Sequence, residues 1–167
     1  MAASSEKLFQ LLDHLGIETR TLNHAPMHTV EDSKRLRGTL GGGHCKCLFL
    51  KDKKGAFLLV VMGEDRRLDM KALFQSGLLK VGKLSFVSPE RMEEMLGVKP
   101  GSVTPFSLIN ADPAQITVVL DQKMLAEALL NYHPLHNEAT TTIKCEDLLK
   151  FIHHLSFETS IIDFDDL

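Results

Sequence analysis

Long apolar runs are missing from this sequence of 167 residues. Its longest unbroken apolar stretch covers residues 56–62, whereas a membrane-spanning helix needs about 20 apolar residues. The first dozen residues also lack the charged leader and apolar stretch of a secretory signal. These absences predict a cytoplasmic protein with no membrane partner.

Cysteine is scarce, and its three copies have no spacing typical of a disulfide framework or a zinc site. Cys45, Cys47 and Cys145 form no CxxC pair and no Cys/His quartet, so we expect a reduced, metal-free chain. Cys45 and Cys47 would share one face of a strand. They are better explained as small buried hydrophobic residues than as nucleophiles, because no charge partner for a thiolate can be placed.

Linkers, low-complexity segments and internal repeats are absent as well. Apolar residues make up 44% of the chain and charged residues 25%, which is ordinary for a soluble globular protein. At this length, folding hides roughly 70% of the surface of the unfolded chain. The sequence therefore predicts one domain, residues 1–157, followed by a short acidic tail, residues 158–167.

Apolar spacing, caps and turn residues predict the helices and strands. Leucines at Leu8, Leu11, Leu12 and Leu15 indicate a first helix, which Ser4 or Ser5 can cap and Gly16 can end. Further helices are predicted over residues 30–37, 69–75, 89–96, 123–130 and 146–155, and strands over residues 18–22, 44–50, 56–62, 116–120 and 138–143. The order has no regular βαβ rhythm, so we expect an α+β domain with a central mixed β-sheet flanked by helices.

Lys46 is the least expected residue of the predicted hairpin, 44–50 and 56–62. Side chains two apart in a strand share a face, so Lys46 should lie beside Leu48 and Leu50. A lysine in an apolar row is costly unless its ammonium finds an anion, a cleft or water at the end of the strand. The pattern alone favours the last of these.

Two loops could carry polar chemistry. Residues 101–105, GSVTP, combine a glycine that frees the backbone with a stiffening proline, so they can present amides to an oxyanion, although most such pairs only make turns. In residues 131–143, His133 and His136 are three apart, but Pro134 disfavours the helix that a metal pair would need. The threonines that follow could be ordinary strand formers or could line a small polar pocket with Asn137.

Four motifs occur in order within residues 5–155. They are H-x-P-x-x-T-V-E from His24, K-C-L-F-L-K-D-K-K-G from Lys46, G-S-V-T-P-F from Gly101 and N-Y-H-P-L-x-N-x-A-T-T-T-I from Asn131. Together they resemble the YbaK and prolyl-tRNA-synthetase-associated domain family of aminoacyl-tRNA editing enzymes. Within this family the chain is most similar to the free-standing ProXp-ala or PrdX branch.

The resemblance implies a cofactor-free deacylase that hydrolyses the ester of mischarged tRNA, foremost Ala-tRNA(Pro), on a mixed-sheet α+β fold. Its implied catalytic residues are Lys46, Gly101 of the GxxxP loop and the pocket histidine His133. Its implied substrate-binding residues are His24, Thr104, Pro105, Asn137 and Thr140. Many members carry asparagine where this chain has Cys47, so the amino-acid preference is less fixed than the reaction.

The sequence leaves other functions open. The same reaction could act on Cys- or Ser-charged tRNA, since relatives share the scaffold and differ in pocket residues. A non-catalytic module that binds tRNA or a synthetase is a second alternative. Prolyl-tRNA synthetase and an elongation factor are candidate docking partners.

The net charge of −3 argues at first against a nucleic-acid partner, but it averages over unlike regions. Residues 34–83 hold 12 Lys and Arg against 4 Asp and Glu, a net charge of +8, while the last ten residues contribute −4. The basic window surrounds Lys46. We therefore predict that the tRNA acceptor end contacts six of its cations, Lys34, Arg35, Arg37, Lys51, Lys53 and Lys54.

Overall fold

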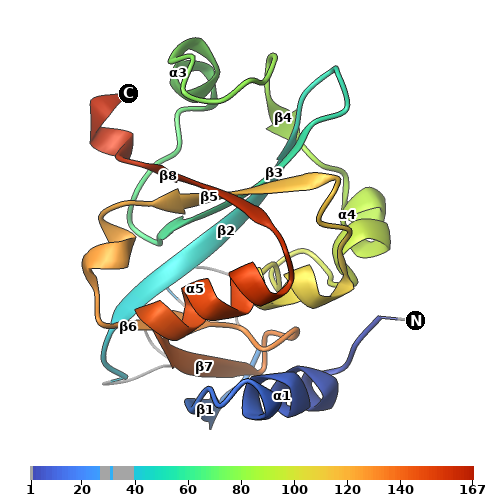
Figure 1. Ribbon diagram of the computed structural model, residues 1–167, viewed down its shortest axis with the longest axis vertical. Coiled ribbons are helices and arrows are strands. Elements are labelled where there is room, and N and C mark those ends of the chain that lie inside the picture. Colours follow the sequence, from blue (N-terminus) through green and yellow to red (C-terminus); the bar gives the residue numbers. More distant parts are fainter. Residues whose placement is uncertain (1, 27–30, 32–39) are drawn as a thin grey trace.

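A central mixed sheet organises the protein, with helices packed on both of its faces (Figure 1). The structure is a computed structural model, and it describes residues 2–26, 31 and 40–167. Apart from residue 31, the predicted helix over residues 30–37 lies outside the described residues, and so do the predicted tRNA contacts Lys34, Arg35 and Arg37. The α+β class with a mixed sheet is confirmed.

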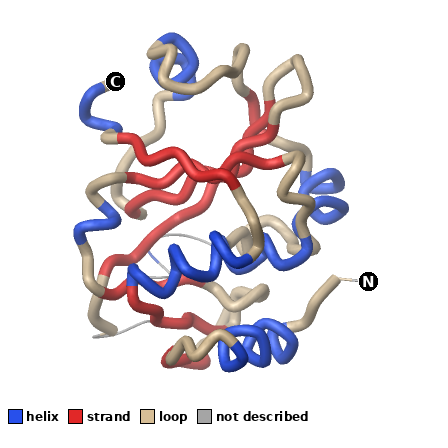
Figure 2. The backbone as a smooth tube through the Cα atoms, viewed as in Figure 1, coloured by secondary structure: helices blue, strands red, loops and turns tan. Residues whose placement is uncertain are grey.

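Within the described residues the sheet has eight strands, and its order is β1-β7-β6-β2-β3-β5-β8, with β4 paired to β2 (Figure 2). Pairing is parallel between β2 and β6, β3 and β5, and β5 and β8, and antiparallel elsewhere. The strands are β1 (Thr19–Asn23), β2 (Gly43–Lys51), β3 (Phe57–Gly63), β4 (Ser85–Phe86), β5 (Ile116–Asp121), β6 (Leu129–Tyr132), β7 (Ala139–Lys144) and β8 (Glu158–Ile162).

The helices begin and end largely at the residues that the sequence indicates. The α-helices are α1 (Ser5–His14), α3 (Met70–Gln75), α4 (Pro89–Leu96) and α5 (Cys145–His154), and the 3-10 helices are η1 (Pro105–Asn110), η2 (Met124–Ala126) and η3 (Phe164–Asp166). In α4 the Ser88 side chain accepts from the amide of Arg91, and Gly97 ends the helix at φ +67°. Ser88 and Gly97 thus cap the two ends of α4 as predicted.

The hairpin β2–β3 is confirmed, and its register decides which side chains share a face. Lys46 pairs with Met62 and Cys45 with Gly63, with unbroken pairing as far as Lys51 and Phe57. Odd-numbered β2 residues such as Phe49 join the larger core, which α1, α4 and α5 cover. Leu50 joins the smaller core on the other face, which α3 covers. The strand therefore separates two environments.

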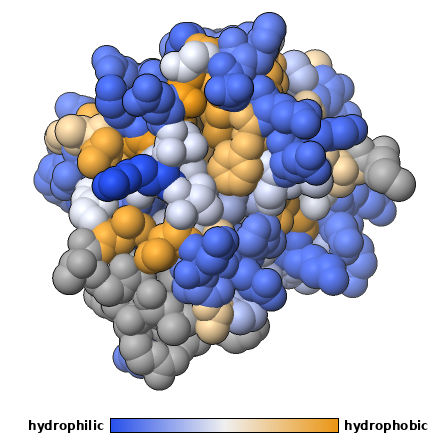
Figure 3. Space-filling model, turned by 90° about the horizontal axis from the view of Figure 1, so that it is seen from below, coloured by the Kyte–Doolittle hydropathy of each residue, from blue (hydrophilic) through white to orange (hydrophobic). Residues whose placement is uncertain are grey.

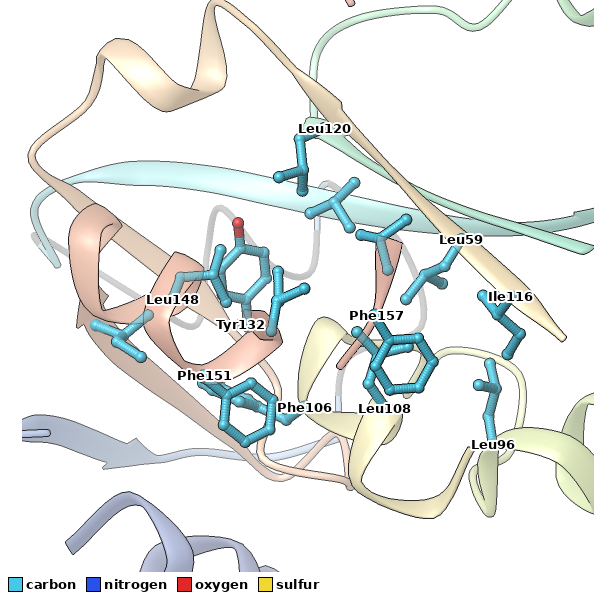
Figure 4. Close-up of a cluster of buried hydrophobic side chains, with 14 of the residues drawn as sticks. Leu59, Leu96, Phe106, Leu108, Ile116, Leu120, Tyr132, Leu148, Phe151 and Phe157 are labelled. Carbon is cyan, nitrogen blue, oxygen red and sulfur yellow. The ribbon is translucent and has the colours of Figure 1, made fainter. Parts of the chain in front are cut away.

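The larger core contains the aromatic residues that fix the helices to the sheet (Figure 4). Phe106 of η1 meets Tyr132 and Phe151 edge to face, at centroid distances of 6.0 and 5.6 Å. Pairs of this geometry contribute about 0.5–1.5 kcal/mol beyond the burial of their area. This packing holds η1, and with it the preceding loop 101–105, against β6 and α5.

Two predictions of the sequence differ from the structure. The predicted helix over residues 123–130 was wrong, since only Met124–Ala126 form a 3-10 turn and Leu129–Tyr132 form β6. β6 gains strand partners on both sides, β2 and β7, and these outweigh local helix propensity. Residues 158–167 are not a separate tail, because β8 runs parallel to β5 and both Ile162 and Phe164 are buried.

Hydrophilic residues cover most of the described surface when the molecule is viewed from below, with smaller apolar areas between them (Figure 3). None of the helices in the described part of the chain has the length and apolar character needed to cross a membrane.

Candidate active site

Three predicted site residues meet where β1 ends and β7 begins. The Nε2 atom of His24 lies 2.9 Å from Oγ1 of Thr140, and the ring centroids of His24 and His133 are 6.2 Å apart in a T-shaped arrangement. The β1–β7 ladder continues past β1 through a bond from the amide of His24 to the carbonyl of Glu138, which fixes this approach. We call His24, His133 and Thr140 the histidine cluster.

Main-chain carbonyls set the tautomers of both histidines. The Nδ1 atom of His24 is 2.8 Å from the carbonyl of Ala25, and that of His133 is 2.9 Å from the carbonyl of Ala139. A carbonyl only accepts, so each Nδ1 carries a proton, and in the neutral form of either ring the lone pair lies on Nε2. In the neutral form of His24 this lone pair accepts from the Thr140 hydroxyl.

Burial disfavours the charged form of His133. Burial is the largest cause that lowers the pKa of His133 below the ordinary 6.5, and repulsion from His24 and His136 lowers this pKa further, while the hydrogen bond to Ala139 raises it. His133 is therefore neutral near pH 7, and its Nε2 can accept a hydrogen bond or a proton.

A small cavity of about 30 Å³ adjoins the histidine cluster. A cavity of this size has room for roughly one water-sized group. Its lining comes from β2, β6, β7 and the turn after β3, and consists of His44, Cys45, Glu64, Asn131, Tyr132, His133 and Thr140. Four separate strands or strand ends thus build one small polar site.

The side chain of Asn131 connects these strands by hydrogen bonds, a role that its place in the fourth motif did not indicate. Its amide nitrogen donates to the carbonyls of Gly41 and Gly43 at 2.9 and 3.1 Å, and its oxygen accepts from the hydroxyl of Thr142. A buried amide needs such partners, so an asparagine between the apolar residues Leu130 and Tyr132 was the available signal. The bonds hold the start of β2 beside β6.

The cysteine thiols of β2 are unsuited to nucleophilic attack. Burial raises the pKa of Cys45 to about 12 and raises that of Cys47 well above its ordinary value. Both residues therefore remain neutral thiols packed against the larger core. The predicted alternation is confirmed, since Cys47 faces away from Lys46.

Lys46 lies on the opposite face of β2 from Cys45, in the row of Leu48 and Leu50. The register pairs His44 with Asn131 and Asn131 with Thr142, so these cavity-side residues share the face of Lys46. The ammonium of Lys46 donates to the main-chain carbonyl of Arg66. Partial burial, followed by repulsion from Arg67, lowers the pKa of Lys46, and Asp65 opposes this. The cation is thus neither free on the surface nor buried unpaired.

The turn after β3 contacts both the cavity and Lys46. Glu64 lines the cavity, and its amide donates to the carbonyl of His44, while the carbonyl of Arg66 accepts from Lys46. We call residues 64–67 the lysine loop. This segment links the cavity to Lys46, and its run of charged residues was the only local signal of it.

The loop 101–105 is built as the approach to η1. Gly101 is exposed and has φ +89°, a left-handed conformation that favours glycine. The hydroxyl of Thr104 caps η1 by accepting from the amide of Phe106 at 3.3 Å, and both Thr104 and Pro105 are buried. Their predicted contact with substrate stays a prediction. Main-chain groups near Gly101 are the more accessible part of the loop.

The remaining predicted residues lie on turns. Asn137 is half-buried in the turn between β6 and β7. Lys51, Lys53 and Lys54 are exposed at the far end of the β2–β3 hairpin. This turn is organised by Asp52, whose carboxylate accepts from the amides of Lys54, Ala56 and Gly82 at 2.8–2.9 Å, and these bonds lower its pKa.

Comparison with known proteins connects this geometry to a reaction. The aminoacyl-tRNA editing domain matches residues 24–151. The prolyl-tRNA editing protein ProX of Acetoanaerobium sticklandii is 34% identical over 144 residues, covering 84% of this chain and 85% of that protein. The prolyl-tRNA synthetase associated domain-containing protein 1 of Bos taurus is 34% identical over 161 residues, covering 95% and 94%.

A solved structure has the same fold. It is described as a candidate trans-editing enzyme for prolyl-tRNA synthetase, and it aligns with a TM-score of 0.71 over 98% of both chains at 19% identity. At this identity the likeness concerns the fold alone.

Proposed function

Because the chain belongs to the aminoacyl-tRNA editing domain family and is an aminoacyl-tRNA hydrolase, we propose that its substrate is alanine esterified to proline tRNA. The editing function named for the ProX relative supports the proline tRNA as the carrier.

Size supports alanine as the amino acid. A synthetase pocket shaped for proline rejects a smaller residue poorly, because one methylene is worth only about 1–3 kcal/mol of discrimination. A second site that admits the small residue and excludes the larger one corrects the error. The observation that carries the proposal is the small polar cavity lined by His133 and Thr140, whose limited volume favours a small side chain over a larger one.

The proposed reaction is hydrolysis of the ester on the terminal ribose. A water oxygen bonds to the carbonyl carbon, the bond from that carbon to the ribose oxygen breaks, and the ribose oxygen leaves with a proton. The products are free alanine and tRNA. Main-chain amides near Gly101 would stabilise the oxyanion, and loss of one such donor typically costs about 10²–10³ in rate.

His133 and Lys46 have separate roles in this proposal. The Nε2 lone pair of neutral His133 accepts a hydrogen bond from the attacking water or from the neighbouring ribose hydroxyl. Lys46 is not among the residues that line the cavity, so we assign it to the phosphate of the terminal nucleotide rather than to the amino-acid pocket.

His24 serves the substrate indirectly. Both of its ring nitrogens are engaged within the protein, by Ala25 and by Thr140. We therefore assign His24 to orienting the hydroxyl of Thr140, whose oxygen lines the cavity and keeps lone pairs for a substrate group. Asn137 on the adjoining turn is assigned to the rim of the same pocket.

The acceptor stem is proposed to lie along the basic window. Lys51, Lys53 and Lys54 are exposed at the hairpin turn, where phosphates can approach without desolvating a core. Docking on prolyl-tRNA synthetase or an elongation factor stays a prediction of the sequence.

A panel of charged tRNAs tests the proposal. Proline tRNA carrying alanine, serine, cysteine or proline is incubated with the purified protein, and release of the amino acid is followed in single turnover. We expect Ala-tRNA(Pro) to be hydrolysed fastest and Pro-tRNA(Pro) to stay intact. Ala-tRNA(Ala) is the matched control for recognition of the tRNA body.

Two results would overturn the proposal. Equal rates on alanine, serine and cysteine would exclude an alanine sieve, and failure to hydrolyse any of the four would exclude the proposed substrate class.

A further inference from the structure

The main-chain carbonyl that accepts from Lys46 belongs to Arg66, whose side chain is held by ion pairs. The guanidinium Nε of Arg66 lies 3.4 Å from an oxygen of Asp121, and another nitrogen pairs with Asp165. The same turn is closed by a bond from the amide of Arg66 to the carbonyl of Gly63, 3.2 Å. The lysine loop is therefore fixed from both its main chain and its side chain.

Asp121 is the buried part of this anchor. Its side chain is fully buried at the end of β5, and its carboxylate also accepts from the amides of Gly63 and Lys123 at 3.3 and 3.1 Å. A buried carboxylate is stable only when charge or hydrogen bonds compensate it. Removal of either partner therefore leaves a costly group, which keeps Arg66 beside Asp121.

Asp165 brings in the C-terminal segment. It lies in η3, which packs on the sheet through Phe164, and it pairs with Lys123 as well as with Arg66. Each exposed pair of this type contributes little to stability on its own. Asp165 thus joins the end of the chain to the loop that receives Lys46.

We propose that Arg66 is a positioning residue for Lys46, and that Asp121 and Asp165 hold Arg66 so that its carbonyl directs the ammonium. The C-terminal segment, residues 158–167, is then part of the editing site rather than an appendage. The contribution to catalysis rests on the proposed function, whereas the contact network does not.

Two variants and one matched control test the network. Arg66→Ala removes the anchor and keeps the main-chain carbonyl, and Asp165→Asn removes the ion pairs of Asp165 with Arg66 and with Lys123. Asp166→Asn is the control, because it removes the neighbouring exposed carboxylate and changes the net charge by the same amount. Thermal melting of each variant verifies that the fold is retained.

Acetylation of lysines by acetic anhydride, quantified by mass spectrometry, reports on Lys46 without any tRNA. We expect labelling of Lys46 relative to Lys53 to rise about two- to fivefold in Asp165→Asn, and more in Arg66→Ala, as the ammonium is released. A general loosening of the fold would raise labelling at other lysines too. Asp166→Asn should leave the ratio unchanged.

Deacylation of Ala-tRNA(Pro) gives the catalytic readout. We expect kcat to fall about tenfold in Arg66→Ala and two- to fivefold in Asp165→Asn, with KM little changed, because misplacement of a functional group by about 1 Å can cost up to 10² in rate.

The outcomes separate the two proposals. If wild-type protein does not edit but the labelling ratio shifts as expected, the proposed function fails and the network stands. If wild-type protein edits and the ratio is unchanged in Arg66→Ala, the positioning role is overturned. Equal effects of Asp165→Asn and Asp166→Asn would also overturn it, since they would reflect net charge alone.

Discussion

Two groups of side chains near the start of β2 are held in different ways. In the first group, His133 and Thr140 are fixed by strands β6 and β7, and a carbonyl of the sheet itself, that of Ala139, accepts from His133. In the second group, Lys46 donates to a carbonyl of a loop, and ion pairs hold that loop.

The two kinds of support should respond differently to ionic strength. Strand pairing resists salt and small charge changes, whereas partly exposed ion pairs weaken as ionic strength rises. We therefore expect the histidine cluster to be a rigid half of the site and the lysine side to be an adjustable half. Three predictions, in order of expected effect, test this contrast.

The largest effect is expected on the lysine side. Lys46→Met keeps an apolar stem beside Leu48 and Leu50 but removes the cation, and we expect single-turnover deacylation to fall by about 10²–10³, as for loss of a group that stabilises developing charge. The melting temperature should change little. Lys46→Arg is the matched control, because it retains a charge with different geometry and should recover part of the rate.

Near wild-type turnover by Lys46→Met would contradict a role for this residue. The histidine cluster would then suffice for deacylation without Lys46, and the proposed division of the site into two parts would fail.

The second effect concerns His133 and pH. His133→Gln should lower deacylation by about 10², the low end for loss of a general base. The pKa of His133 is below 6.5 in the folded protein, so the unfolded chain binds the proton more readily. The stability that neutral His133 contributes is thus fully present above about pH 6.5 and is lost as the pH falls below it.

Melting of wild type and His133→Gln between pH 7.5 and about 5 measures this linkage. We expect the wild type to lose more stability than the variant on acidification. His154→Gln, on the exposed end of α5, is the control and should follow the wild type. Parallel curves for wild type and His133→Gln would show that burial does not disfavour the charged ring.

The smallest effect is expected at the hairpin turn. Lys53→Glu and Lys54→Glu should weaken tRNA binding and lower its salt dependence, because each lost phosphate contact reduces the slope of log K against log salt by about 0.9 on a duplex. Turnover at saturating tRNA should be nearly unchanged. Binding is measured by fluorescence anisotropy between about 50 and 200 mM salt.

Lys7→Glu, on the exposed side of α1, changes the charge equally and is the control. If Lys53→Glu and Lys7→Glu alter the slope to the same extent, long-range charge rather than contact at the hairpin governs binding.

Local patterns were sufficient for several elements. Alternation and the charged turn predicted the hairpin β2–β3, and Ser88, Pro89 and Gly97 marked the ends of α4. Such signals are short in range, because strand faces and helix caps depend on residues two to four positions apart. Lys46 was placed on the face of Leu48 and Leu50 in this way.

Elements that depend on distant partners were not predicted. Leu129 and Leu130 continue a leucine-rich helical pattern, but β2 and β7 lie on either side and make this segment a strand. Likewise β8 forms only because β5 offers it a parallel edge. Loop closure over such separations leaves no trace in local spacing.

The candidate site shows the same division. Family motifs identified His24, His133 and Thr140, and the structure brings these three together. The fourth motif begins at Asn131 but did not indicate that its amide joins β6 to the glycine run, and no motif included Arg66, whose carbonyl accepts from Lys46. These residues act on partners that only the folded chain places beside them.

The fold class, the faces of the hairpin and the residues that carry the family resemblance follow from the sequence. Alternation and capping are properties of neighbouring residues, so they can be read along the chain. Only in the folded chain do strands β2, β6 and β7 bring Lys46 and Thr140 onto one face of the sheet, and only there do Asp121 and Asp165 meet at Arg66. Contacts between residues far apart in sequence arise from sheet order, and sheet order depends on the packing of the whole core.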